Sequence, residues 1–67
     1  MLLKTQIFEL CPGKYQNLRE LAQAMGISLS QVYGVKHGQH GIGEEFIIGA
    51  LKAFPEYGIG DLFYFTA

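Results

Sequence analysis

The sequence predicts an all-α domain of four or five short helices, the second and third arranged as a helix-turn-helix. Three observations support this prediction. Apolar residues recur at helical spacing along most of the chain, N-cap residues precede two of these segments, and glycine or proline follows nearly every segment. With 67 residues and a mass of 7.5 kDa, residues 1–67 are expected to form one domain.

The first helix is predicted over residues 2–11, because its apolar positions fall at i, i+4, i+7 and i+8, on one helical face. These positions are Leu3, Ile7, Leu10 and Cys11. Proline cannot continue a helical hydrogen-bond ladder, so Pro12 and Gly13 end the segment.

The second helix is predicted over residues 18–25. Asn17 is a suitable N-cap, and Glu20 stands at the third helical position, from which it can reach back to the cap. Gly26 follows as a residue that tolerates the left-handed conformation. The apolar positions of this helix are Leu18, Leu21, Ala22 and Met25.

The third helix is predicted over residues 28–37, where Ser28 and Gln31 form a capping-box pattern and Gly38 ends the segment. Its apolar residues are Leu29, Val32 and Val35. A connection of about three residues joins this helix to the second. A glycine-containing turn that short makes two helices cross steeply, as in a helix-turn-helix.

The fourth helix is predicted from about residue 44 to residue 54, and Pro55 stops it. Its acidic residues lie in the first turn and Lys52 lies in the last, which matches the helix dipole. One further helical turn is expected at residues 61–63. The tail after it is apolar on every side, so it either packs on both faces or forms an association surface.

Composition and charge narrow the function classes. The net charge is −1, but residues 1–43 carry 4 − 2 = +2 and residues 44–67 carry 1 − 4 = −3. The first part is therefore better suited than the second to face an anion such as nucleic acid, although ordinary scatter of a few charges explains the difference equally well. A single cysteine, Cys11, excludes an internal disulfide and is expected to be a buried small hydrophobe.

No segment points to an enzyme, a metal site or a membrane protein. A chain of this size hardly provides a catalytic pocket, and we expect neither an enzyme nor a bound cofactor. The two histidines, His37 and His40, are separated by a helix-ending glycine and have no carboxylate or cysteine nearby, so no metal site is expected. No apolar run approaches the roughly 20 residues that span a bilayer, and a cytoplasmic protein is expected.

The stretch from Leu18 to Gly38 resembles the helix-turn-helix of Cro and CI-type phage repressors, the Xre-like family. The resemblance rests on the order of its parts. A small residue, Ala22, lies where the two helices touch, and Gly26 follows four residues later. The apolar Ile27, the hydroxyl cap Ser28, two core valines and a final glycine come next. The fourth helix and the turn at residues 61–63 look like the remaining helices of this lambda-repressor-like domain.

The resemblance implies sequence-specific binding of double-stranded DNA by a small, prokaryotic or phage, transcriptional regulator. The helix at 28–37 is then expected to enter the major groove. The residues expected to contact DNA are Arg19, Ser28, Leu29, Ser30, Tyr33, Gly34, Lys36 and His37. Arginine and lysine suit phosphates, hydroxyls suit phosphates or base edges, and leucine suits a thymine methyl group. For Gln31 a capping role competes with adenine readout.

Two expectations concern partners. Because one recognition helix reads only a few base pairs, a homodimer is expected, and its surface is predicted to include Leu62, Phe63, Tyr64 and Phe65. The alternative is a protein–protein interaction module on a helix-turn-helix scaffold without DNA binding. The pI of about 6.0, the apolar tail and the weak base-reading side chains favour that alternative.

Overall fold

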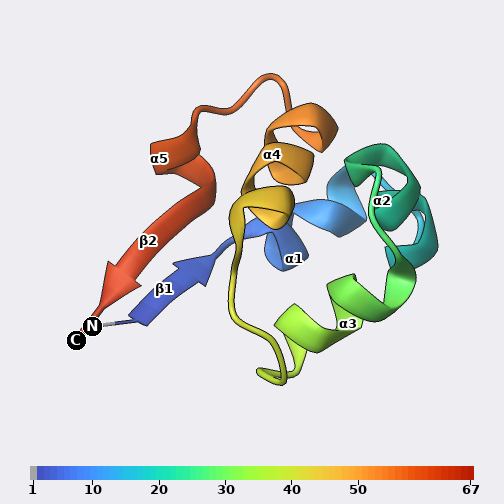
Figure 1. Ribbon diagram of the computed structural model, residues 1–67. Helices are drawn as coiled ribbons and strands as arrows, with labels where there is room; N and C mark the ends of the chain where they lie inside the picture. The colour runs from blue at the N-terminus through green and yellow to red at the C-terminus, as the bar shows by residue number, and fades with distance from the viewer. Residues whose placement is uncertain (1) are drawn as a thin grey trace.

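Two short strands at opposite ends of the chain pair with each other, and helices fill the interval between them (Figure 1). The computed structural model describes residues 2–67. Strand β1 (Leu2–Thr5) runs antiparallel to β2 (Phe63–Thr66), with Leu3 opposite Phe65 and Thr5 opposite Phe63. The domain is therefore mostly helical, and the all-α expectation is wrong at its two ends.

The helix predicted over residues 2–11 is replaced by β1, by α1 (Ile7–Leu10) and by a 3₁₀ turn, η1 (Cys11–Gly13). The helical spacing of the apolar residues is real, and Ile7 and Cys11 are buried. Residues 2–5, however, take their hydrogen-bond partners from the other end of the chain. A strand partner about 60 residues away leaves no trace in local periodicity.

The remaining helices agree closely with the predicted ones. They are α2 (Leu18–Met25), α3 (Leu29–Lys36), α4 (Glu44–Ala53) and α5 (Ile59–Leu62). α4 ends one residue earlier than expected, and α5 begins two residues earlier. In α5, the Asp61 carboxylate accepts a hydrogen bond from the Gly58 backbone N–H at 2.9 Å, which favours the earlier start.

The core lies between the helices α1 to α5, and η1 and the start of β2 also contribute to it. Its fully buried members come from every part of the chain: Ile7, Leu21, Met25, Val32, Phe54 and Leu62. Cys11 belongs to the same cluster, and burial raises the pKa of its thiol above the ordinary value. Cys11 therefore packs as the small hydrophobe the sequence predicts.

The C-terminal segment is only partly free to associate. Leu62 and Phe63 are buried, 0% and 7% exposed, so the expectation that they lie on a dimer surface is wrong. Tyr64 and Phe65 are 41% and 67% exposed. The Thr5 hydroxyl also connects β1 to the end of α5, because it donates a hydrogen bond to the Leu62 carbonyl oxygen at 2.9 Å.

Candidate nucleic-acid interface

The connection between α2 and α3 is built from local capping interactions. The Asn17 side chain accepts a hydrogen bond from the Glu20 backbone N–H at 2.9 Å, as predicted. The Glu20 carboxylate accepts from the Gln16 N–H, one residue before the cap. Gly26 closes α2 with φ of 73°, and the Ile27 N–H donates back to the Ala22 carbonyl at 3.1 Å.

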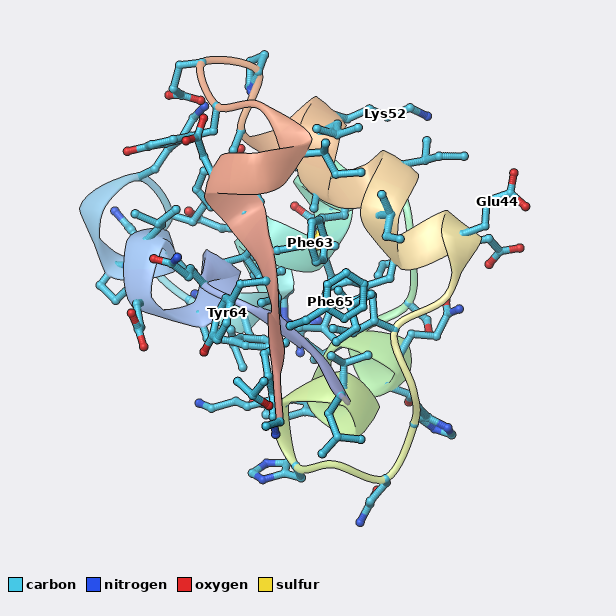
Figure 2. The ribbon with its side chains drawn as sticks, turned by 90° about the vertical axis from the view of Figure 1, so that its left-hand side faces the viewer. Glu44, Lys52, Phe63, Tyr64 and Phe65 are labelled. Carbon is cyan, nitrogen blue, oxygen red and sulfur yellow. The ribbon has the colours of Figure 1, made fainter. Side chains whose placement is uncertain are left out.

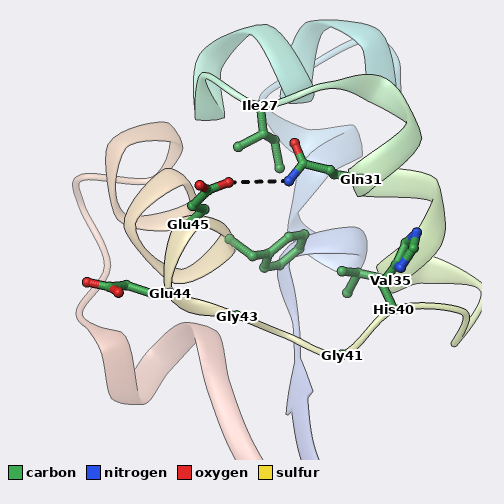
Figure 3. Close-up of a pocket in the computed structure, with 9 residues that line it drawn as sticks. Ile27, Gln31, Val35, His40, Gly41, Gly43, Glu44 and Glu45 are labelled. Atoms are coloured by element: carbon green, nitrogen blue, oxygen red, sulfur yellow. Dashed lines mark hydrogen bonds between the residues drawn. The ribbon is translucent and has the colours of Figure 1, made fainter.

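The start of α3 is fixed by a complete capping box. The Gln31 N–H donates to the Ser28 hydroxyl at 3.2 Å, and the Ser28 N–H donates to the Gln31 side-chain oxygen at 3.1 Å. The Gln31 amide nitrogen then donates to Glu45 of α4 at 3.4 Å (Figure 3). Both ends of the Gln31 amide are thus occupied, which favours its capping role over adenine readout.

A stripe of three exposed side chains runs along the outer face of α3. Ser30, Tyr33 and His37 lie at i, i+3 and i+7, on the face opposite the buried Val32 and the half-buried Val35. Tyr33 is 44% exposed. Its ring stacks on the His37 imidazole, with centroids 5.9 Å apart and planes 5° apart. The pair presents a flat, polar-edged surface to solvent.

Two of the predicted contact residues are not on this surface. Leu29 is half-buried and packs against the core. Gly34 is buried, and the His40 imidazole lies over it, where a side chain on Gly34 would stand. The Gln39 and His40 N–H groups also donate to the Gly34 carbonyl at 2.8 and 3.0 Å. The expected approach of a ligand to Gly34 is therefore wrong, because the chain itself fills that space.

The predicted cations, Arg19 of α2 and Lys36 of α3, are exposed. Within residues 2–67 the one ion pair joins Lys14 to Glu56 at 2.9 Å, so Arg19 and Lys36 are not held by a carboxylate. Sequence reasoning missed a third cation, Lys4, because residues 2–5 were expected to be helical. Lys4 from β1 and Lys36 from α3 line one groove, together with Gln39 and His40.

A carboxylate also lies beside α3. Figure 3 shows the hollow between α3 and α4, which Ile27, Val35 and Phe46 line with apolar atoms. Glu44 and Glu45 stand at its rim, and Glu45 contacts Gln31 near the start of α3. The N-terminal end of α3 thus faces the negative charge of Glu45. Its C-terminal end carries Lys36, which shares a groove with Lys4. The surface is therefore not uniformly positive.

Comparison of the chain with protein-family models, curated proteins and solved structures finds no match. In the described part of the chain, no three histidine, cysteine or acidic side chains gather as metal ligands. Among residues 2–67 no helix has the length and apolar character needed to cross a membrane.

Proposed function

We propose that this chain binds double-stranded DNA through the exposed face of α3, as a small helix-turn-helix transcriptional regulator. The observation that carries the proposal is the α2–α3 unit: two capped helices of eight residues, joined through a left-handed Gly26. This unit leaves a polar and aromatic stripe of one helix unpartnered within the domain. The resemblance to Cro and CI-type repressors supports the same reading.

The dimensions of α3 suit a DNA groove. An α-helix with its side chains is about 10–12 Å across, and the major groove of B-DNA is about 12 Å wide. With α3 in the major groove, the Ser30 and Tyr33 side chains would reach base edges. Ser28 lies at the N-terminal end of α3, which would lie deepest in the groove. Hydroxyl groups donate and accept, so they contact bases or phosphates but discriminate weakly between sequences.

We expect the phosphate contacts to come from Arg19, Lys36 and Lys4. Arg19 at the start of α2 offers bidentate donors, and Lys36 with Lys4 offers two ammonium groups along one groove. Three such contacts give moderate, salt-sensitive affinity, so specificity would depend on pairing two recognition helices.

The alternative function is a protein-interaction module on the same scaffold. One observation favours it: Glu45 lies against Gln31, where a DNA-binding surface would hold a phosphate or a base. A carboxylate there repels the DNA backbone unless the two are separated.

The deciding experiment is a fluorescence anisotropy titration on random-sequence duplex DNA at about 50 and 200 mM salt. The proposal expects binding that weakens with salt. It also expects that Arg19→Ala and Lys36→Ala each lower the slope of log K against log salt by about 0.9, one phosphate contact. Lys14→Ala is the matched control, because Lys14 is paired with Glu56 away from α3, and its slope should match wild type. Absence of binding at the lower salt concentration would support the interaction module instead.

A further inference from the structure

We propose that the outer face of α4 binds a second copy of this chain, with the two α4 helices antiparallel about a two-fold axis. The inference goes beyond DNA binding and does not depend on it. It also replaces the predicted surface at residues 62–65, half of which is buried. Figure 2 shows this face of α4 in profile, with Glu44 and Lys52 projecting from the helix.

The outer face of α4 carries an exposed isoleucine between two opposite charges. Glu44, Ile48 and Lys52 lie at i, i+4 and i+8, one above the other on the helix. Ile48 is 46% exposed, while Gly49 and Ala50 turn toward α2 and the core. At 46% exposure, Ile48 leaves a large part of its apolar surface in contact with water within this domain.

An apolar hollow continues this face of α4 toward the sheet. Ile47 of α4, Ile59 of α5, and Leu3 and Phe65 of the two strands line it together. Ile59 is 55% exposed and Phe65 is 67% exposed, so much of the apolar surface of this hollow is in contact with solvent. Figure 2 shows the Phe65 ring beside α4 on this side of the molecule. A contiguous apolar surface that spans four elements is typical of an interaction site.

The charge pattern selects a second copy as the occupant. A two-fold interface presents the same patch twice, so the patch must be complementary to itself when it is reversed. Glu44 and Lys52 are separated by about 12 Å along α4, because they are eight positions apart and each position adds a rise of about 1.5 Å. Antiparallel pairing about Ile48 places Glu44 against Lys52 of the second copy, twice. In residues 2–67 neither side chain has an ion-pair partner, because the ion pair found there joins Lys14 to Glu56.

The size of the chain points the same way. A standard interface removes about 800 Å² from each partner, which is about a fifth of the 4359 Å² surface of this chain. Small domains without a disulfide or a metal often gain stability by association. An α4-to-α4 contact centred on Ile48 does not use the exposed stripe of α3, and α4 packs on α2 through a different side of the helix, at Gly49.

The first test is sedimentation velocity of the purified chain without DNA. We expect a dimer at about 100 μM, an accessible concentration for micromolar affinity. Ile48→Asp should be a monomer at the same concentration with an unchanged circular dichroism spectrum, since Ile48 is exposed. Tyr33→Asp, on the exposed face of α3, is the control and should remain a dimer. A monomeric wild type, or an Ile48→Asp variant that still dimerises, would overturn the proposal.

The second test addresses the antiparallel geometry. Glu44→Lys and Lys52→Glu each replace two attractive contacts by two repulsive ones, and each should weaken dimerisation about tenfold. An equimolar mixture of the two variants restores both attractive contacts and should form heterodimers with wild-type affinity. Charge effects on the helix dipole are the same alone and in the mixture, so recovery on mixing reports the contact. No recovery would overturn the antiparallel pairing. Failure of DNA binding affects neither test.

Discussion

Gly49 of α4 lies against the backbone of Met25 in α2. A Cβ on Gly49 would stand 2.7 Å from the Met25 carbonyl oxygen and 2.9 Å from the Met25 Cβ, closer than side-chain atoms approach. Glycine in a helix interior is unfavourable by about 1 kcal/mol relative to alanine, and here the close approach of two helices explains it. This contact sets how tightly α4 packs on α2.

Gly49→Ala should therefore destabilise the domain, despite the better helix propensity of alanine. The obstacle is backbone, so α2 and α4 must separate, and we expect a loss of about 1–3 kcal/mol in the free energy of unfolding. Urea denaturation measures this loss. Gly60→Ala is the control, because nothing lies within 4 Å of its Cβ position, and its stability should stay the same or rise. Equal stability for both variants would contradict the packing argument.

Gly34→Ala should behave differently from Gly49→Ala. A Cβ on Gly34 would overlap the His40 imidazole, but His40 is exposed and its side chain can turn away. The helix gains about 1 kcal/mol from alanine, which offsets the lost contact, so the free energy of unfolding should hardly change. Amide chemical shifts should instead move in residues 38–42, which follow α3. A large loss of stability without such shifts would show that His40 cannot leave its place.

Sequence reasoning succeeded where the deciding interactions are local. The Asn17 cap, the left-handed Gly26 and the capping box of Ser28 with Gln31 each involve residues no more than five positions apart. The exposure of Ser30, Tyr33 and His37 on α3 followed from the same spacing, whereas Leu29 and Gly34 were expected on that surface and are not on it. The physical reason is that caps and helical periodicity are set within one or two turns.

Sequence reasoning failed where partners are distant. Leu3 and Phe65 pair across the sheet, and this long-range contact turns residues 2–5 into a strand. Lys4 consequently joins Lys36 in one groove, which no local pattern indicates. The burial of Gly34 under His40 was missed for the same reason, since a loop conformation decided it.

The Lys14–Glu56 pair should make stability depend on pH. A hydrogen bond from its own backbone N–H and another from the Lys14 ammonium hold the pKa of Glu56 below its ordinary value of 4.5. A lowered pKa in the folded state contributes stability above the ordinary value, and this contribution disappears as the pH falls through the folded value. Glu56→Gln should thus be less stable than wild type at neutral pH, and the difference should shrink as the pH falls through the folded pKa of Glu56.

The variant Lys14→Ala separates the two causes of that shift. The backbone hydrogen bond is the larger cause and does not involve Lys14. Lys14→Ala should therefore retain part of the pH dependence that Glu56→Gln loses. Thermal unfolding between pH 3 and pH 7, about the range in which carboxylates titrate, measures both. A stability difference between Glu56→Gln and wild type that is the same at both ends of this range would contradict the assignment.

Ser28 and Ser30 are matched hydroxyls with different expected roles. Ser28 caps α3 through its hydroxyl and also stands at the end of α3 that would enter DNA first. Ser28→Ala should lower the free energy of unfolding by about 0.5–2 kcal/mol, the value of an N-cap. Ser30 is exposed and free of capping bonds within residues 2–67, so Ser30→Ala should leave stability unchanged and weaken DNA binding alone.

Denaturation and anisotropy on the same two variants separate folding from recognition. If α3 binds DNA, Ser30→Ala lowers affinity for a selected operator by up to about 1 kcal/mol, the net value of a hydrogen bond. Because phosphate contacts by the lysines are untouched, its salt slope should equal that of wild type. A Ser30→Ala variant with full affinity and full specificity would show that this face of α3 does not read bases. The interaction module would then account better for the exposed stripe.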